Sequence, residues 1–365
     1  MAKNRFLVAL CIPWLLAGCE SFDYRYSPVQ EHQFMSRVLA TTSNPPRSDP
    51  LYLTAEAKAE LNARIHRGWG ERRKLRELRD FLFSKDEMHL RYEADTTKTA
   101  MQVWQTRSGN CLSLTNLFIA SARYLGMDSH YETVEVKPSW DRRGNLMVRY
   151  EHIVATGQLL DGVQYSVDFM PDFVVGDRRA RVISDRKALA LYYNNLGAES
   201  LIAGKKKRAI GELAEAIQTD GSLSDAWNNM GAALNHSGEK TLAEFSFQRA
   251  VYLDMGNYSA LANLAEFYQA EGREREARYF LDRINVYRKR NPWYRYFVAN
   301  NLYEKGQYRK AISMLDGAVS LKRDEPDFYV ALAKSYAKLG DDDQSRYYLT
   351  LANKYSKPQQ DGNRD

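Results

Sequence analysis

The sequence has few cysteines and no long apolar run, and these absences exclude several kinds of protein. Three cysteines occur in 365 residues, and none is paired at the spacing of zinc ligands. Neither a phosphate-binding glycine loop nor a zinc-type His-Glu-x-x-His motif is present. Beyond residue 20, no stretch is long and apolar enough to cross a bilayer as a helix. We therefore expect no metal and no cofactor.

The charge of the chain is also small. The formal net charge is +6, and it falls to +4 (50 − 46) if a leader containing Lys3 and Arg5 is removed. This excess is too small to indicate a nucleic-acid partner. Apolar and charged fractions are ordinary, and the length is sufficient for two or three globular domains.

The first nineteen residues have the pattern of an export signal. Lys3 and Arg5 precede an apolar segment, residues 6–16, that is too short to span a membrane. The following Leu-Ala-Gly-Cys19 resembles the lipobox of bacterial lipoproteins. That resemblance implies a signal peptide over residues 1–18, acylation of Cys19 by a fatty acid such as palmitate, and a membrane anchor. The alternative is a plain secretory signal with an incidental cysteine.

Residue 20 bears on the location of the protein. Glu20 stands where an aspartate would resemble an inner-membrane retention signal, so we expect the outer membrane of the cell envelope, facing the periplasm. Residues 19–50 contain four prolines and are interpreted as a tether without a core of its own.

A single cysteine remains once the leader is removed and Cys19 is acylated. Cys111 follows a short loop, residues 104–110, and begins an apolar helix that ends at Gly126. The unpaired N–H groups and the positive dipole end of a helix N-terminus favour a thiolate. A lone thiol in an exported protein indicates a nucleophile, although an inert buried cysteine has the same pattern.

Partners for this thiol are predicted on two strands. After helices at 54–67 and 71–83, the β-rich segments 129–136, 146–159 and 163–169 follow, with a hairpin signal at Asp161-Gly162. The hairpin brings His152 and Asp168 onto neighbouring strands. A carboxylate beside an imidazole orients it to take a thiol proton. The predicted α+β domain covers residues 51–180, with the Cys111 N–H and the Gln105 side chain as candidate oxyanion donors.

The order of these residues resembles the transglutaminase-like cysteine superfamily, which is papain-like. The matching positions are Cys111 after Arg107-x-Gly-x, then His152 and Asp168 on successive strands, and the likeness covers about residues 70–175. It implies a Cys-His-Asp triad that performs acyl transfer or hydrolyses amides or peptides, although some members have no known catalysis. The chain departs from the pattern at Val154, where many members carry an aromatic residue.

The second half of the chain repeats every 34 residues. The period resembles the tetratricopeptide repeat, with five copies over residues 190–359 that form an all-α solenoid with a concave groove, followed by a disordered tail at 360–365. Small residues mark the turn inside each copy and the contact between its two helices. The turn positions are Gly204, Gly238, Gly272, Gly306 and Gly340, and the contact positions are Gly197, Gly231, Ala265, Ala299 and Ala333.

A peptide-binding surface is predicted in the groove. Asn195, Asn229 and Asn263 recur in phase, at a position that resembles the asparagine ladder of peptide-binding members, and Trp293 and Tyr296 continue the groove as an aromatic wall. Tolerated surface asparagines and ordinary core aromatics are the alternatives. The basic residues Arg283, Arg288, Lys289, Arg290 and Arg295 are either a solvated face or a contact for an acidic partner.

The sequence therefore predicts an α+β transglutaminase-like (papain-like cysteine) domain followed by an all-α tetratricopeptide-repeat solenoid. The leading hypothesis is a lipid-anchored envelope enzyme whose Cys111, His152 and Asp168 act on a carboxamide or peptide carbonyl, while the repeats bind a protein partner or substrate. The alternative is a non-catalytic envelope scaffold or adaptor that uses the repeats for protein–protein interaction. Nucleic acid is not an expected partner.

Overall fold

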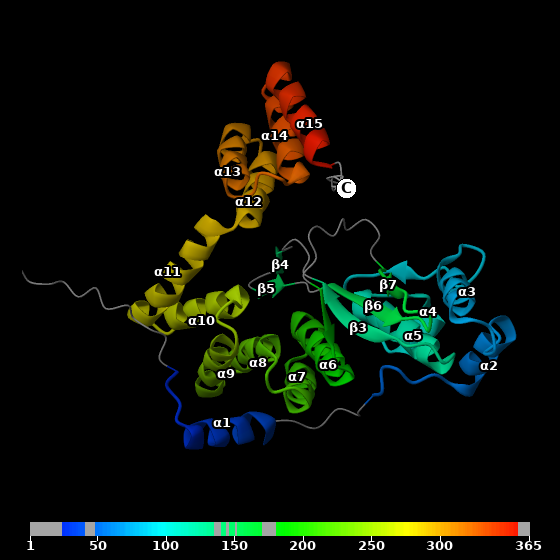
Figure 1. Ribbon diagram of the computed structural model, residues 1–365. Helices are drawn as coiled ribbons and strands as arrows, with labels where there is room; N and C mark the ends of the chain where they lie inside the picture. Colours follow the sequence, from blue (N-terminus) through cyan, green and yellow to red (C-terminus); the bar gives the residue numbers. More distant parts are fainter. Residues whose placement is uncertain are drawn as a thin grey trace, which may run out of the picture.

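The computed structural model describes residues 24–40, 48–134, 140–143, 146–149, 152–169 and 180–356. Within these residues, a mixed α/β region is followed by an all-α array of tetratricopeptide-like repeats (Figure 1). The leader, Cys19 and the C-terminal tail lie outside the described residues.

Of the four helices from residue 55 to residue 124, three begin at or next to the predicted residue, whereas the helix over 100–106 was not predicted and takes in residues 104–106 of the expected loop. Helix α2 (Ala55–Arg64) is capped by Thr54, whose hydroxyl accepts a hydrogen bond from the Ala57 N–H at 3.3 Å. Helix α3 (Glu71–Phe83) has the predicted bounds. Helices α4 (Ala100–Thr106) and α5 (Cys111–Tyr124) follow. Every residue of α5 from 112 to 122 is buried, so α5 is the central helix of this region.

An antiparallel sheet lies against α5. Within the described residues it has four strands in the order β7-β6-β3-β8. The strands are β3 (His130–Val134), β6 (His152–Gln158), β7 (Gln164–Val167) and β8 (Ala180–Ile183). The Asp161-Gly162 hairpin joins β6 to β7, as predicted. Strand β8, which the sequence reasoning missed, pairs with the free edge of β3.

Two smaller pairings complete the region. Strands β1 (Arg91–Tyr92) and β2 (Ser108–Gly109) are parallel, and β2 ends just before α5. Strands β4 (Trp140–Arg143) and β5 (Leu146–Arg149) form an antiparallel hairpin, and β5 lies against helix α10 of the repeats. The predicted strand over 146–159 is therefore described as two separate strands, β5 and β6.

The predicted repeats are five helix pairs within the described residues, from α6 to α15. In each pair the two helices pack closely on one another. Left-handed glycines turn the chain between the two helices at the five predicted positions, with φ between +71° and +85°. The helices are α6 (Asp185–Ile202), α7 (Lys206–Thr219), α8 (Ser224–His236), α9 (Lys240–Leu253), α10 (Tyr258–Ala270), α11 (Glu274–Arg290), α12 (Pro292–Glu304), α13 (Tyr308–Leu321), α14 (Pro326–Lys338) and α15 (Asp342–Ser356).

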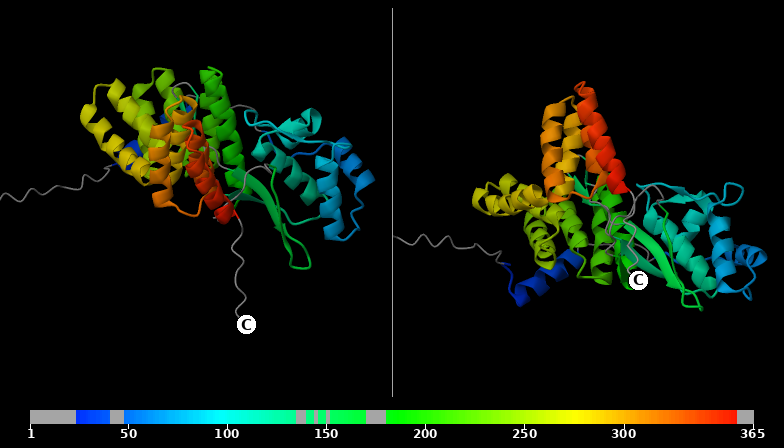
Figure 2. Two further views of the ribbon diagram at one scale, coloured as in Figure 1. Left: turned by 90° about the horizontal axis from the view of Figure 1, so that it is seen from above. Right: turned by 45° about the horizontal axis from the view of Figure 1, so that its top comes forward.

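The array is interrupted after the third repeat, which corrects the expectation of one continuous solenoid. Buried apolar residues form one core that ends at Ile284 and a second core from Ala299 to Ala352. Helices α12–α15 stand as a group apart from α6–α10 (Figures 1 and 2).

The turn after α11 explains the interruption. Helices α7, α9 and α13 have 14 residues and are followed by four-residue turns, but α11 has 17 and only Asn291 separates it from α12. The first two of these turns contain glycine, whereas the corresponding segment of the third repeat is Arg288-Lys-Arg, which favours a helix. The turn after α13, which begins Lys322-Arg323, also lacks glycine, so this composition permits the longer α11 without requiring it.

The interpretation of residues 19–50 as a tether is corrected for the part that the structure describes. Residues 28–40 form helix α1 (Pro28–Ala40), which packs on α9. Phe34 stacks on Phe245 with ring centroids 5.2 Å apart, and Glu31 pairs with Arg249 at 2.8 Å. The prolines of residues 19–50 favoured the tether interpretation, because the apolar side chains of α1 become buried only against α9, which is distant in the sequence.

Candidate functional site

Cys111 is the first residue of α5. Asn110 caps the helix, and its side chain accepts a hydrogen bond from the Ser113 N–H at 2.9 Å. Cys111 is partly exposed, whereas the following residues 112–122 of the helix are buried. The sequence prediction that this sulfur meets a helix N-terminus is confirmed.

The hairpin brings His152 and Asp168 together. Ala155 pairs with Val167, so the register sets Val154 opposite Asp168. His152 lies two residues before Val154 and therefore shares its face of the sheet, diagonal to Asp168. In the structure His152 Nε2 and Asp168 Oδ1 are 2.8 Å apart, within hydrogen-bonding distance. His152 is 3% exposed and Asp168 is partly exposed.

His152 also interacts with Cys111, so all three predicted residues meet. Burial by itself lowers the pKa of His152, but hydrogen bonds to Asp168 and Cys111, with the charges of both, outweigh it and raise that pKa from 6.5 to about 9. An imidazole so placed stays protonated at neutral pH. The site therefore aligns the Cys111 sulfur, the His152 ring and the Asp168 carboxylate in sequence, with Cys111 as the partly exposed member.

Two further predictions about this site have different outcomes. Gln105 is exposed on α4, six residues before the thiol, and its role as an oxyanion donor stays a prediction. Val154, the position of the family's aromatic residue, is fully buried in the sheet. Val154 lies on the face of the sheet that carries His152, opposite Asp168, so a small side chain borders the triad there.

The asparagines of the predicted groove hydrogen-bond to one another. Asn229 donates to Asn194 at 2.9 Å, and Asn263 donates to Asn228 at 3.0 Å, each across a repeat boundary. All three predicted asparagines, including Asn195, are partly exposed. Two of the three thus use an amide N–H to join neighbouring repeats. The sequence missed their partners because Asn194 and Asn228 lie one residue out of the repeating column.

The predicted aromatic wall packs inside the second group of helices. Trp293 and Tyr296 of α12 both contact Phe328 of α14, with ring centroids at 4.7 Å and 5.3 Å. Because the array is interrupted after α11, these side chains do not continue the surface of the asparagines. They are partly exposed and stabilise the fourth and fifth repeats.

No protein-family model matches this chain. A search of curated proteins also finds no match. Among solved structures, MamA AMB-1 is similar, with 20% identity, coverage of 47% of this chain and 100% of that chain, and a TM-score of 0.26. YrrB, described as a TPR protein with an unusual peptide-binding site, has 17% identity over 46% of this chain and 86% of that chain, with a TM-score of 0.26. MamA MSR-1 has 20% identity over 46% of this chain and 95% of that chain, with a TM-score of 0.25.

The repeat architecture is supported by the chain itself. The 34-residue period and the helix pairs of α6–α15 agree position by position. Across the described ranges, no group of three or more His, Cys, Asp or Glu side chains has a metal-binding arrangement. In the same part of the chain, no helix has the length and apolar character needed to cross a membrane.

Proposed function

We propose that the α/β region is a transglutaminase-like domain of papain-like cysteine fold, in which Cys111, His152 and Asp168 form a catalytic triad. The observation that supports this most directly is the interaction of one buried imidazole with both the thiol and the carboxylate. The three side chains are 41 and 16 residues apart in the chain, so local structure alone does not bring them together.

The reaction begins with an ion pair. Asp168 holds His152 through Nε2, so the other ring nitrogen, Nδ1, is the one that takes the proton of the Cys111 thiol. The thiolate then adds to the carbonyl carbon of a carboxamide or peptide. The N–H groups at the start of α5 stabilise the oxyanion, with Gln105 as a second candidate donor.

Collapse of this intermediate completes the transfer. The C–N bond breaks, His152 gives its proton to the departing ammonia or amine, and a thioester remains on Cys111. Water or a primary amine then adds to the thioester after losing a proton to His152. The C–S bond breaks, and the thiolate and the imidazolium are regenerated.

The test uses Cys111→Ala in the full chain. Envelope extract supplies candidate substrates, and a fluorescent primary amine reports transfer while mass spectrometry detects an acyl group on Cys111. We expect the variant to lose both signals while its thermal midpoint changes little, because the residue is partly exposed. Full activity of Cys111→Ala would reject the mechanism.

The repeats favour a second candidate function, a non-catalytic adaptor of the envelope. Tandem helix pairs expose extended surfaces that suit protein–protein interaction, and the inter-repeat asparagines lie on such a surface. If deletion of the protein gives a growth phenotype, its full rescue by Cys111→Ala favours the adaptor. Failure of that rescue favours the enzyme.

We also propose that Cys19 is acylated and anchors the protein at the outer membrane, facing the periplasm. The support is the lipobox after a basic and apolar leader. Cys19→Ser is the test, since loss of the acyl acceptor releases the protein from the membrane fraction. A variant that stays in that fraction through a high-salt wash contradicts the anchor.

A further inference from the structure

Among the described residues, one face of the third repeat is not covered by a closely packed following repeat, although β5 lies against α10. In the repeats before and after, the first helix of the next repeat packs on the pair before it: α8 on α6 and α7, α10 on α8 and α9, and α14 on α12 and α13. Helix α12 makes little contact with α11, because α11 continues past the position of the usual turn.

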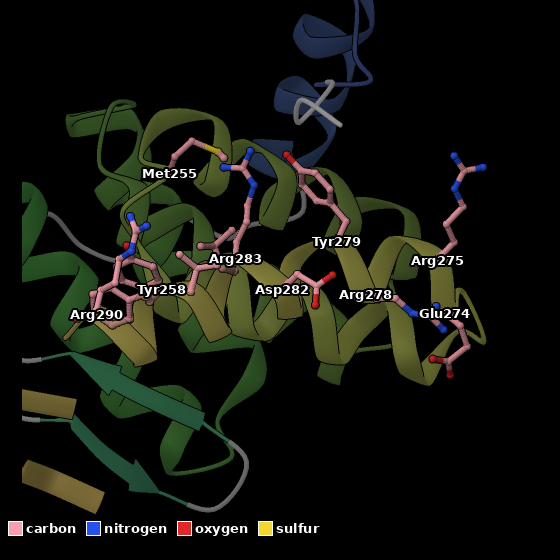
Figure 3. A pocket seen from close by; sticks show the side chains of 12 residues that line it. Met255, Tyr258, Glu274, Arg275, Arg278, Tyr279, Asp282, Arg283 and Arg290 are labelled. Carbon is pink, nitrogen blue, oxygen red and sulfur yellow. The ribbon is translucent and has the colours of Figure 1, made fainter. Parts of the chain in front are cut away.

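A hollow lies along this face. Its volume is about 1040 Å³, and α11, α10 and the turn before α10 line it (Figure 3). We call it the α11 groove. Its apolar part includes Leu261, Val286, which is 52% exposed, and Tyr258, whose ring stacks on Tyr287. Leu261 is buried and Tyr258 is partly exposed, so Val286 and the tyrosine rings form the accessible apolar strip, which suits the apolar stripe of another helix.

The charged part of the α11 groove is basic. Four arginines line it against two acidic residues, Glu274 and Asp282, for a formal balance of 4 − 2 = +2. All four arginines are exposed, and the guanidinium of Arg283 lies over the Tyr279 ring at 4.9 Å. The arginines are Arg275, Arg278, Arg283 and Arg290.

We propose that the α11 groove binds an acidic amphipathic helix of a partner protein. Its apolar stripe replaces the missing first helix of a following repeat, and its carboxylates pair with the groove arginines. A concave site between two helices favours an inserted helix over a membrane, because a bilayer presents a flat surface. Arginine suits this role because its planar guanidinium binds carboxylates in a bidentate manner.

The probe is a fluorescent 18-residue synthetic helix with a leucine and alanine stripe flanked by glutamates. A matched peptide carries lysines in place of the glutamates. We expect saturable binding of the glutamate peptide, weakening with salt, and at least a tenfold loss of affinity in the double variant Arg278→Glu, Arg283→Glu. The control is Arg309→Glu, Lys310→Glu on exposed positions of α13, which makes the same charge change and should leave binding intact.

Three results overturn this proposal: equal binding of both peptides, equal loss in the control variant, or no binding of the glutamate peptide up to millimolar concentration. A fourth is binding of anionic phospholipid vesicles that depends on the groove arginines without peptide binding. Circular dichroism of each variant verifies that the helices are intact.

A separate network joins the repeats to the thiol. Glu199 of α6 accepts a hydrogen bond at 2.8 Å from the N–H of Thr97, which belongs to the α/β region, and it also bonds the Thr97 hydroxyl. That hydroxyl in turn accepts from the Asn110 amide at 2.7 Å. Thr97 and Asn110 are 5% and 6% exposed, so water does not substitute for these bonds.

The chain of bonds closes at the first turn of α5. Ser113 donates its N–H and its hydroxyl to the side-chain Oδ1 of Asn110, and the Lys98 N–H donates to the Ser113 hydroxyl at 2.7 Å. Asn110 directly precedes Cys111. The bonds of Asn110 to Thr97 and Ser113 are buried and those of Glu199 and Lys98 are partly buried, so a continuous path of hydrogen bonds runs from α6 to the helix start.

From this network we infer that Glu199 is a positioning residue for Cys111 and that the first repeat is a working part of the thiol site. This inference rests on the proposed function. Asn195 lies four residues before Glu199, hence on the same side of α6. A ligand that moves this helix therefore changes the thiol.

The readout is the rate at which iodoacetamide alkylates Cys111 across pH, which needs no substrate. We expect Glu199→Ala to slow alkylation at pH 7 about threefold or more and to move the profile to higher pH, because the helix start loosens. Glu199→Gln keeps an acceptor for the Thr97 N–H and should retain most of the rate. Arg186→Ala, an exposed change on α6, is the control.

A second variant, at a different link of the network, distinguishes a local effect on Cys111 from misfolding caused by Glu199→Ala. Thr97→Val keeps the shape but removes the acceptor of Asn110, and it should shift the profile in the same direction as Glu199→Ala. If neither Glu199→Ala nor Thr97→Val changes the pH profile of alkylation, while His152→Ala does change it, the inference about Glu199 is wrong and the triad stands. A profile unaffected by His152→Ala rejects the triad itself.

Discussion

His152 contacts a thiol on one side and a carboxylate on the other, and this pairing sets its protonation. Burial opposes the charged ring, but Asp168 and Cys111 outweigh it and raise the pKa of His152 to about 9. The two partners therefore keep the ring protonated, and removing either one should lower the pKa of His152 from about 9.

Asp168→Asn tests this balance. Loss of the carboxylate charge should lower the pKa of His152 from about 9, because the burial penalty then meets less opposition. NMR titration of the His152 ring measures the change. A His152 titration that stays near 9 in Asp168→Asn contradicts this account of the site.

The same shift predicts how stability depends on pH. The pKa of His152 is higher in the folded state than the ordinary value of 6.5, so its stabilising contribution is complete below about 6.5 and is lost as the pH rises through about 9. Urea unfolding at several pH values measures this contribution. The stability gap between the wild type and Asp168→Asn should narrow from pH 6 to pH 10.

At the scale of elements, the start of α5 and the β6–β7 hairpin place the chemistry. The sequence predicted both: the helix from its apolar stripe and Gly126, and the hairpin from Asp161-Gly162. What it left open was the register, within a residue or two. The pairing of Ala155 with Val167 resolves it and puts His152 and Asp168 on one face.

Gly157 is a sensitive point of that hairpin. A Cβ there would collide with the Asp128 carbonyl oxygen and the Tyr165 ring. Gly157→Ala should therefore destabilise the fold by at least about 2 kcal/mol, as overpacking does. Urea unfolding measures it, with Gly70→Ala as the matched control because a Cβ at 70 meets nothing within 4 Å. Equal stability of the two variants would contradict the predicted collision.

At the scale of the whole molecule, the interruption after α11 separates two cores. Because α12–α15 bury their own apolar residues, we expect them to open independently of α6–α10. Hydrogen exchange in mild urea should show loss of protection in α12–α15 before α8. Simultaneous loss in both groups would contradict the separation.

Helix α1 joins the first core from the other end of the chain. Phe34 stacks on Phe245, and Tyr26 meets the same ring edge-on at 5.0 Å. Phe34→Ala should expose residues 28–40 to protease and destabilise the protein by about 1–3 kcal/mol, less than a fully buried phenylalanine. Limited proteolysis with mass spectrometry follows the cleavage. Val29→Ala, at an exposed position of the same helix, should leave the protection unchanged.

The sequence by itself determined what depends on local pattern. The 34-residue period fixed the helix pairs, the apolar stripes fixed α3 and α5, and Asp161-Gly162 fixed one hairpin, since propensity and periodicity act over a few turns or strands. The order of Cys111, His152 and Asp168 was also visible there.

Only the tertiary structure decided the long-range contacts. The register of β6 and β7, the docking of α1 on α9 and the asparagine pairs across repeats depend on residues distant in the chain. The longer α11 could not be predicted either, because Arg288-Lys-Arg is compatible with a helix but the similar Lys322-Arg323 begins a turn, so packing decides between the two. The network from Glu199 to Asn110 exists for the same reason: each link comes from a different segment, which only the packed molecule brings together.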